Sequence, residues 1–359
     1  GVFTKNAFCA APVQLTKSHM QSEASRYLVT NTGNANAGTG EPGRVHALRV
    51  CERMAEIGGV SVTSVLPFST GVIGEPLPVE KILAALPEAY AALSENSWAQ
   101  AASGIMTTDT RPKGGSVKLP LGGGAITITG IAKGAGMIKP NMATMLAYVA
   151  TDMKIDSEQL QVLVRNACDC SFNRITVDGD TSTNDSAMLI ATGASPIAWQ
   201  NLSAEERQHF ELALNNLFIS LAQQIVQDGE GATKFVTVKV LGGTDVEECL
   251  AVAYTVAESP LVKTALFASD PNWGRILAAI GRAGLKDLDV EAIEIFLDDV
   301  LIAKNGGRAE SYTEEQGAAV MAKEEIAITI DLHRGDVEET VWTMDFSHQY
   351  VTINAEYRT

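Results

Sequence analysis

The sequence predicts a mixed α/β protein with a large first domain and a smaller α+β domain at its C-terminus. Helical and strand-like patterns alternate along most of the chain, and the strands become shorter beyond about Leu285. The length of 359 residues exceeds what one comfortable core accommodates. Apolar residues make up 46% and charged residues 19%, as in globular proteins. We therefore place the boundary between the domains near residue 285.

In the first half, strands and helices are separated by polar loops. We predict strands at 27–30, 62–67 and 125–132, and helices at 41–58, 79–85 and 90–105. The loop 31–40 consists of Asn, Thr, Gly and Ala residues, which suit either a close backbone approach to a ligand or a compact turn. The loop 68–74 contains Thr70-Gly71, a hydroxyl and an amide that suit either a ligand or a glycine turn.

In the second half, the same alternation continues up to the last strand. We predict strands at 145–151, 175–177, 233–240, 294–297, 300–303, 326–332 and 341–345, and helices at 157–170, 202–226, from near 252 to 268, and after the turn 269–275. Ser203 and Glu206 form a capping box for the long helix. The pattern of residues 350–359 predicts a strand followed by a polar tail.

The charge of the chain argues against two classes of partner. Lys and Arg number 27 against 43 Asp and Glu, for a formal net charge of −16. A field of this sign repels phosphate backbones and anionic membranes, so we expect neither nucleic acid nor a membrane as partner. No run of 18 apolar residues is present. The chain opens Gly1-Val2-Phe3 without an initiator Met, so we expect residues that precede it to be missing.

The cysteines and the acidic loop give no metal site. The five cysteines are scattered, and Cys168 and Cys170 have neither redox nor zinc spacing, which favours reduced cysteines in a cytosolic protein. The run 178–185 is acidic and rich in hydroxyls, but Gly179 and Leu189 stand at the wrong positions for a calcium loop. We expect a hydrogen-bonded loop there, and no metal.

The stretch 133–147 has two interpretations. Its glycine-punctuated turn runs through Pro140-Asn141 to Ala143-Thr144 and then into an apolar strand. Thr144 can simply begin that strand or cap a helix. Alternatively, a chain break before Thr144 would give its hydroxyl a free α-amine with a pKa near 8 as a base. Glu230, which lies between two glycines, also has two interpretations. Its carboxylate could bind an ammonium group of a ligand, or it could be a solvated turn residue.

Ordered sequence blocks across the whole chain resemble the ornithine acetyltransferase family, also called glutamate N-acetyltransferases. The stretch 133–147 is similar to the family's cleavage-site signature. Further blocks that resemble the family are Asn-Thr-Gly-Asn-Ala-Asn-Ala at 31–37, Ser-Thr-Gly-Val-Ile-Gly at 69–74, Ile-Met-Thr-Thr-Asp-Thr at 105–110, Val-Asp-Gly-Asp-Thr-Ser-Thr-Asn-Asp at 177–185, Gly-Glu-Gly-Ala-Thr-Lys at 229–234, Ser-Asp-Pro-Asn-Trp-Gly-Arg at 269–275 and the terminal Tyr-Arg-Thr. At Gly38 the family commonly has a cysteine.

The resemblance implies a layered α-β-β-α sandwich of the ornithine acetyltransferase/DmpA type. It also implies self-cleavage between Ala143 and Thr144. Fragment 1–143 and residues 144–284 would form the sandwich, and 285–359 the smaller domain. Thr144 would be the nucleophile, with Thr70 and Gly71 as oxyanion hole. The implied substrate contacts are Thr107, Lys133, Thr144, Glu230, Asn354 and Thr359. Lys133 would meet the substrate α-carboxylate and Glu230 a cationic amine, while Asn354 and Thr359 would close the pocket.

The implied reaction moves an acetyl group from N2-acetyl-L-ornithine to L-glutamate in the cyclic pathway of arginine biosynthesis. It proceeds by ping-pong chemistry through an acetyl-Thr144 ester and needs no cofactor. Some family members also take the acetyl group from acetyl-CoA, and members commonly assemble as α2β2 from their cleaved chains in the cytoplasm.

Two other functions fit part of the pattern. An N-terminal-nucleophile aminopeptidase or amidase would share the self-cleavage but pass the acyl group to water. An amino-acid-binding protein would keep the bond before Thr144 intact and show no turnover.

Overall fold

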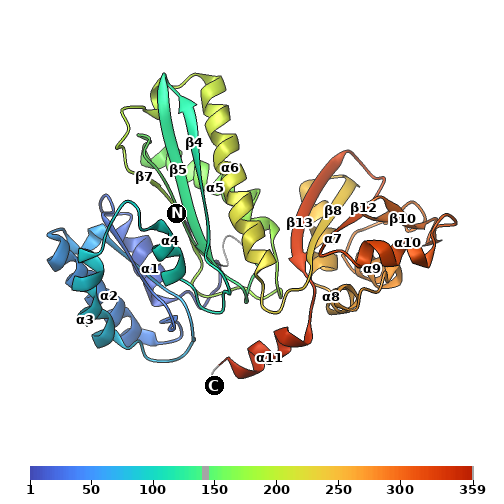
Figure 1. The fold of residues 1–359 in the computed structure, drawn as a ribbon, viewed down its shortest axis with the longest axis horizontal. Coiled ribbons are helices and arrows are strands. Elements are labelled where there is room, and N and C mark those ends of the chain that lie inside the picture. The colour runs from blue at the N-terminus through green and yellow to red at the C-terminus, as the bar shows by residue number, and fades with distance from the viewer. Residues whose placement is uncertain (140–144, 358–359) are drawn as a thin grey trace. The chain divides into compact units, whose positions relative to one another are not determined.

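The computed structural model describes residues 1–139 and 145–357 (Figure 1). These residues form two compact units, each taken by itself below. The first unit comprises residues 1–173 and 181–225, and the second comprises 174–180 and the chain from 226 onward.

A five-stranded sheet forms the centre of the first unit. Its strand order is β1-β7-β6-β5-β4, and β6 and β7 are parallel whereas the other neighbours are antiparallel. The strands are β1 (Val2–Phe3), β4 (Lys113–Leu121), β5 (Gly124–Lys133), β6 (Leu146–Thr151) and β7 (Ser186–Ala191). In β5 the predicted alternation holds, because Ile126 and Ile128 are fully buried while Thr127 and Thr129 are half-buried.

One face of this sheet is covered by helices α5 (Ser157–Asp169) and α6 (Ala204–Gln227). Figure 1 shows α6 running along β4 and β5. Glycines in these strands admit the helix, since a Cβ at Gly115 would lie 2.8 Å from Leu217, and one at Gly130 would lie 3.1 Å from Leu221. The predicted capping box begins α6, with Ser203 and Glu206 exchanging hydrogen bonds.

The opposite face packs on a parallel pair of strands, β2 (Tyr27–Asn31) and β3 (Val65–Ser69). Phe68 of β3 meets Tyr148 of β6 edge to face at 5.2 Å between ring centroids. Helices α1 (Ala11–His19) and α2 (Gly40–Gly58) cover the outer side of this pair, and α3 (Val79–Ala91) packs on α2. The unit is therefore layered α-β-β-α, which confirms the predicted mixed α/β class and sandwich. Helix α4 (Trp98–Gly104) lies beside β4 and β5.

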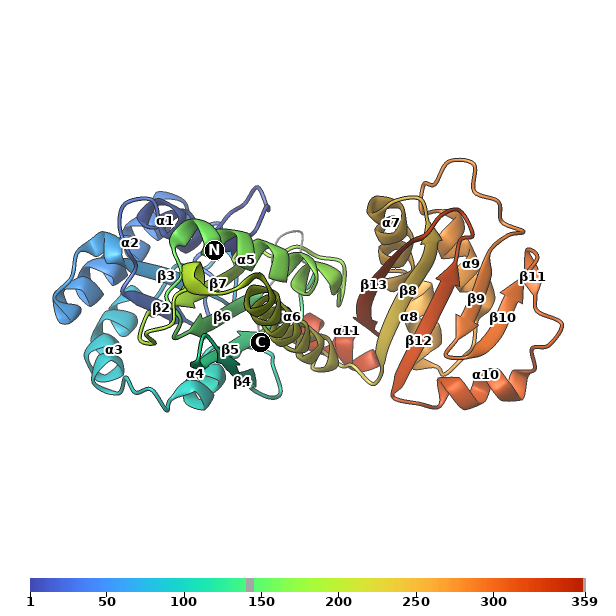
Figure 2. The ribbon, with the colours of Figure 1, turned by 90° about the horizontal axis from the view of Figure 1, so that it is seen from above.

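A six-stranded mixed sheet forms the second unit, as Figure 2 shows from above. Its order is β11-β10-β9-β12-β8-β13, with β8 and β12 parallel. The strands are β8 (Phe235–Gly243), β9 (Glu294–Leu297), β10 (Val300–Lys304), β11 (Gly307–Arg308), β12 (Glu325–Asp331) and β13 (Val337–Met344). The helices are α7 (Val246–Ala257), α8 (Pro260–Phe267), α9 (Trp273–Gly281), α10 (Glu314–Met321) and α11 (His348–Glu356). Alternate valines of β8 and isoleucines of β12 share one apolar core with α7 and α9.

The two units divide between residues 225 and 226, whereas the sequence placed a boundary near 285. Residues 226–284 belong to the second unit because β8 lies between β12 and β13 and carries α7 against its face. The helix predicted from near 252 to 268 is two helices, since Ser259 caps a new helix that begins with Pro260.

The prediction of a strand at the C-terminus was wrong. Residues 348–356 form helix α11, which Ser347 caps by accepting a hydrogen bond from the Tyr350 amide. The β-branched run Val351 to Ile353 suggested a strand, but α11 has no buried residue. No neighbouring strand among the described residues pairs with it, so local capping decides the conformation.

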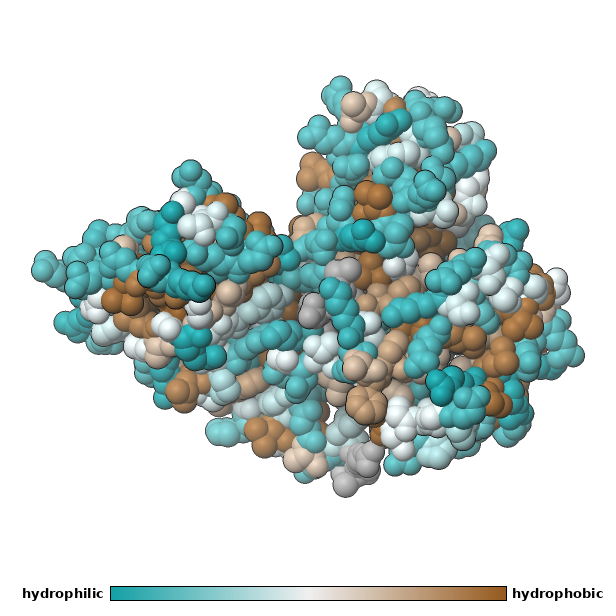
Figure 3. Space-filling view, turned by 180° about the vertical axis from the view of Figure 1, so that it is seen from behind, coloured by the Kyte–Doolittle hydropathy of each residue, from teal (hydrophilic) through white to brown (hydrophobic). Residues whose placement is uncertain are grey.

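The hydrophilic character of the surface agrees with the globular composition of the chain. The face seen in Figure 3 is largely hydrophilic, with hydrophobic residues in separate patches. Within residues 1–139 and 145–357, no helix combines the length and the apolar character needed to cross a membrane.

Lys263 is an unusual member of the core of the second unit. Its side chain is fully buried on α8, where the ammonium donates to Thr343 Oγ1 at 2.9 Å and to the Met344 carbonyl. It also lies 4.5 Å from the centre of the Phe346 ring. Burial lowers the pKa of Lys263 to about 7, although nearby carboxylates, first among them Asp345, raise it.

This lysine is expected to make stability rise with pH above neutrality. Between pH 7 and 10.5 the unfolded chain binds a proton that the folded chain has released, so the free energy of unfolding increases with pH there. Below pH 7 the cost of the buried charge is fully present. Lys263→Met should flatten this rise in urea unfolding curves, and Lys286→Met, at an exposed position, should not. Equal slopes for wild type and Lys263→Met would contradict the assignment.

Candidate functional site

Three predicted site residues meet where strands of the first unit end. Strand β3 ends at Ser69 and delivers Thr70, and β5 ends at Lys133, on the face of the sheet that packs against β2 and β3. Thr107 follows helix α4 on the polar loop before β4. Lys133 pairs in register with Leu146, the first residue of β6.

Lys133 is the centre of this cluster. Its side chain is buried, and its ammonium donates to Thr107 Oγ1 at 2.8 Å and to Thr70 Oγ1 at 3.2 Å. Because an ammonium has no acceptor, both hydroxyl oxygens accept here and keep their own hydrogens for donation elsewhere. The arrangement therefore presents a cation and two oriented hydroxyl donors at one end of the sandwich, which suits an anionic or developing oxyanionic group.

Gly71 occupies a position that excludes any side chain. Its φ is +132°, and a Cβ there would lie 2.2 Å from the Gly33 carbonyl carbon and 2.5 Å from the Asn34 nitrogen. A glycine is required because the two backbone segments touch at this point. The close packing fixes the Gly71 peptide beside Thr70.

The asparagine-rich loop 31–40 supports this end of the sandwich. Asn31 donates to the Asn34 carbonyl, Asn34 to the Glu75 and Pro76 carbonyls, and Asn36 to the Gly43 carbonyl. The side chains are thus used within the fold, which favours the compact turn over a ligand loop.

A residue of the acidic loop performs a similar structural role. Asn184 is buried and donates to the Ser69 carbonyl at 2.9 Å and to the Ala35 carbonyl at 2.6 Å. It ties the end of β3, just before Thr70, to the loop beside it.

A buried ion pair next to Lys133 was not predicted from the sequence. Asp109 accepts from Lys113 Nζ at 2.6 Å, and the two side chains are 0% and 1% exposed. Desolvation acts to raise the pKa of Asp109, but the charges of Lys133 and Lys113 outweigh it and hold that pKa below its usual range. The only sequence signal was an aspartate within the polar block 105–110, four residues before a lysine.

In the second unit, Glu230 and Asn354 are brought together. The buried Glu230 accepts from Asn354 Nδ2 on α11 at 2.7 Å. Ser347 Oγ donates to the Gly231 carbonyl at 2.6 Å, and Gly231 has φ +73°. Asp345 accepts three hydrogen bonds from Thr233 and Lys234. Several hydrogen bonds therefore hold the loop 229–234 in place. This argues against the interpretation of Glu230 as a solvated turn residue.

The charge of Glu230 affects the pKa of two tyrosines in this region. Burial raises the pKa of Tyr350, and the charges of Asp178 and Glu230 raise it further. Burial likewise raises the pKa of Tyr357, with Glu230 as the second cause. An acidic environment of this kind favours a cationic ligand group.

The predicted residues are thus found in two groups, one in each unit. Thr70, Gly71, Thr107 and Lys133 belong to the first unit, and Glu230 and Asn354 to the second. The predicted cleavage site Ala143-Thr144 and the predicted contact Thr359 lie outside the described residues.

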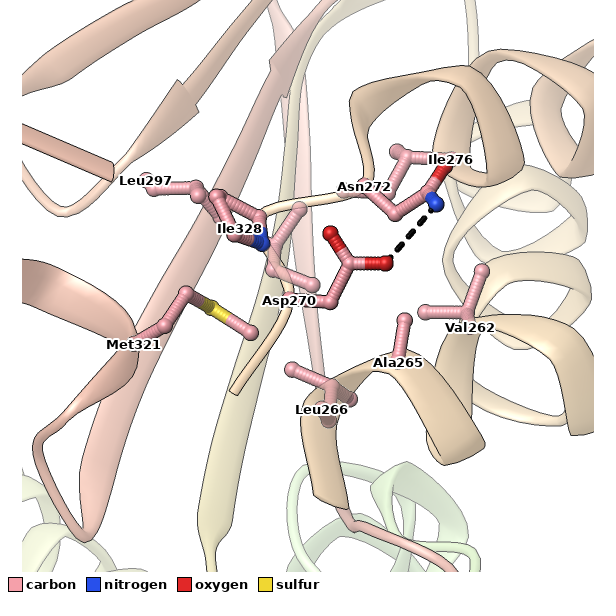
Figure 4. Close-up of a pocket in the computed structure, with 10 residues that line it drawn as sticks. Val262, Ala265, Leu266, Asp270, Asn272, Ile276, Leu297, Met321 and Ile328 are labelled. Atoms are coloured by element: carbon pink, nitrogen blue, oxygen red, sulfur yellow. Dashed lines mark hydrogen bonds between the residues drawn. The ribbon is translucent and has the colours of Figure 1, made fainter. Parts of the chain in front are cut away.

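The small cavity in Figure 4 is distinct from both groups. It lies in the second unit beside α8 and α9 and has a volume of about 10 Å³, the space of a single water molecule. Asn272 donates to Asp270 at its edge at 2.9 Å. The described residues also contain no group of three or more His, Cys, Asp or Glu side chains arranged to hold a metal ion.

Comparison with known proteins gives matches over the whole chain. A family model described as the ArgJ family matches residues 1–359. The arginine biosynthesis bifunctional protein ArgJ of Pseudomonas syringae pv. tomato is 62% identical over 362 residues, covering 100% of this chain and 89% of the relative. The protein of the same name from Pseudomonas fluorescens is 62% identical over 360 residues, with the same coverage. A crystal structure of the arginine biosynthesis bifunctional protein ArgJ from Bacillus halodurans matches with 38% identity and a TM-score of 0.53, covering 57% of this chain and 96% of that chain.

Proposed function

Since this chain belongs to the ArgJ family, we propose that it is a glutamate N-acetyltransferase of arginine biosynthesis that works through Thr144. It moves an acetyl group from N2-acetyl-L-ornithine to L-glutamate. The observation that carries the assignment of residues is the hydrogen-bonded cluster of Lys133, Thr107 and Thr70 at the strand ends. In sequence, Thr144 stands two residues before Leu146, which is the register partner of Lys133.

The nucleophile is made by cleavage of the chain. Thr144 Oγ attacks the carbonyl carbon of Ala143, the peptide C–N bond breaks, and the acyl group moves from nitrogen to oxygen. Water then hydrolyses the ester, which leaves a carboxylate on Ala143 and a free α-amine on Thr144.

Acetyl transfer then uses the same hydroxyl. The α-amine of Thr144 takes the proton of Oγ as the oxygen attacks the acetyl carbonyl of acetylornithine. Thr70 Oγ–H and the Gly71 amide donate to the oxyanion that develops. The amide bond breaks, ornithine leaves with the proton, and acetyl-Thr144 remains. The amine of glutamate attacks this ester, which releases N-acetylglutamate and restores the Thr144 hydroxyl.

The remaining site residues select the substrate. The Lys133 ammonium binds the α-carboxylate that acetylornithine and glutamate share. Glu230 binds the side-chain ammonium of ornithine, and Asn354 and Thr359 close the pocket. The buried position of Glu230 and the acidic field at Tyr350 and Tyr357 support this role. We also assign to the protein an α2β2 assembly of its two fragments, a place in the cytoplasm, and acetyl-CoA as a second acetyl donor.

An exchange assay tests the function directly. Purified protein is incubated with acetylornithine, with and without glutamate, and ornithine, N-acetylglutamate and acetate are measured. Ornithine release that depends on glutamate and equals the N-acetylglutamate formed is the expected result. Release of ornithine with acetate, without any need for glutamate, would instead identify a hydrolase. A separate reaction with acetyl-CoA and glutamate alone tests the second donor.

A further inference from the structure

The buried carboxylate of Asp109 connects three separate segments around the Lys133 cluster. Its Oδ1 accepts from Lys113 Nζ at 2.6 Å and from the Gly134 amide at 2.7 Å. Its Oδ2 accepts from the Thr107 amide at 3.0 Å. The first contact reaches the start of β4, the second the residue after Lys133, and the third the loop that carries the Thr107 hydroxyl.

Two of these contacts act next to groups that the proposed reaction needs. Asp109 holds the backbone amide of Thr107, and Thr107 is the residue whose hydroxyl accepts from Lys133. At Gly134 the chain leaves β5 with φ +152°, and a Cβ there would lie 2.9 Å from Ile138. The Asp109 contact therefore fixes the backbone at Gly134, where the chain leaves β5 directly after Lys133.

The ionised state of Asp109 is what makes these contacts strong. Burial alone would raise its pKa, but Lys133 and Lys113 lower it, so the group stays an anion across the physiological range. An anion that accepts from two amides and an ammonium forms charge-assisted hydrogen bonds, which are shorter and stronger than neutral ones. Lys113, with its side chain 1% exposed, supplies the opposite charge inside the fold.

We propose that Asp109 is a positioning residue for both self-cleavage and acetyl transfer, with Lys113 as its counter-ion. The pair sets the positions of Thr107, Lys133 and the Gly134 turn without touching the substrate. This inference rests on the proposed function, because acetyl transfer is one of its two readouts. Cleavage into fragments 1–143 and 144–359 is the other.

The test separates positioning from a purely structural role. Asp109→Asn and Lys113→Met each remove one charge of the buried ion pair and keep the other, so each should lower the melting temperature. The double variant Asp109→Asn/Lys113→Met removes both charges and should regain much of the melting temperature. We expect its kcat/KM for acetylornithine to remain at least roughly 100-fold below wild type, with slow cleavage, as for a displacement of about 1 Å at a catalytic site. Recovery of kcat/KM along with the melting temperature would overturn the proposal.

A second variant tests the proposal even if the double variant does not fold. Asp109→Glu keeps the charge next to Lys113 but moves the carboxylate by one methylene away from its two amide donors. It should fold, cleave slowly and show a lower kcat for acetylornithine, and wild-type cleavage and kinetics would overturn the proposal. Glu339→Gln serves as the matched control, because it breaks the partly buried Arg174–Glu339 pair of the second unit, whose side chains are 16% and 19% exposed. It should lower the melting temperature and leave KM unchanged.

The same assays distinguish a failure of the proposed function from a failure of the role proposed for Asp109. If wild type releases no ornithine in response to glutamate, the proposed function fails, whatever the variants do. If wild type is active and the double and Asp109→Glu variants match it, only the role of Asp109 fails.

Discussion

Thr144→Ala is expected to leave the chain as one intact polypeptide and to abolish glutamate-dependent release of ornithine. The substitution removes the hydroxyl to which we assign the attack on the Ala143 carbonyl and, after cleavage, on the acetyl carbonyl. Loss of a nucleophile that acts as part of a unit commonly costs about 10⁴-fold or more in kcat. Denaturing electrophoresis with N-terminal sequencing reads the first effect, and the exchange assay reads the second.

Thr144→Ser is the matched control because it keeps the hydroxyl. It should still yield fragments that end at Ala143 and begin at residue 144, and it should retain measurable exchange. An active Thr144→Ala chain, or a wild-type chain that is active while intact, would remove Thr144 from the mechanism.

Lys133→Met should produce the second large effect, a fall of roughly 10²–10³-fold in kcat/KM for acetylornithine. The substitution keeps the length of the buried side chain and removes the charge that we assign to the substrate α-carboxylate. It also removes the hydrogen bonds to Thr70 and Thr107 that orient their hydroxyls. Both kcat and KM are therefore expected to change, as steady-state kinetics at varied acetylornithine and glutamate would show.

Lys118→Met provides the comparison for a lysine without a site role. Lys118 is exposed on β4, in the same sheet as Lys133, so its loss should leave both kinetic constants near wild type. A Lys133→Met enzyme with unchanged KM and kcat would show that the substrate carboxylate is bound elsewhere.

Periodic patterns predicted the sheet strands best when a strand buries one face. The alternation of isoleucine and threonine from 125 to 132 predicted β5, because Ile126 and Ile128 are buried while Thr127 and Thr129 are half-buried. The prediction of a strand for the C-terminal residues was wrong for the opposite reason. No residue of helix α11 is fully buried and the helix pairs with no strand among the described residues, so its β-branched residues carry no information about a sheet, and the Ser347 cap sets the conformation.

Among the candidate site residues, those in recognisable sequence blocks could be proposed from the sequence, and Asp109, which acts through tertiary contacts, could not. Thr70, Thr107 and Lys133 are distant in sequence, yet the fold places their side chains within hydrogen-bonding distance. Asp109 is different, because an aspartate in a polar loop usually binds solvent or caps a turn. Only the three-dimensional structure shows that its carboxylate is buried between a lysine and two amides.

The strand order of the five-stranded sheet has a consequence for the two fragments that the proposed cleavage before Thr144 would give. In the order β1-β7-β6-β5-β4, fragment 1–143 supplies β1, β5 and β4, whereas β7 and β6 come from fragment 144–359. The later fragment is thus inserted between strands of the earlier one, hydrogen-bonded along both of its edges. Cutting the bond before Thr144 would therefore not create separable partners. The two proposed fragments would be interleaved within one sheet, so they could part only by unfolding, and each would depend on the other for a complete sheet.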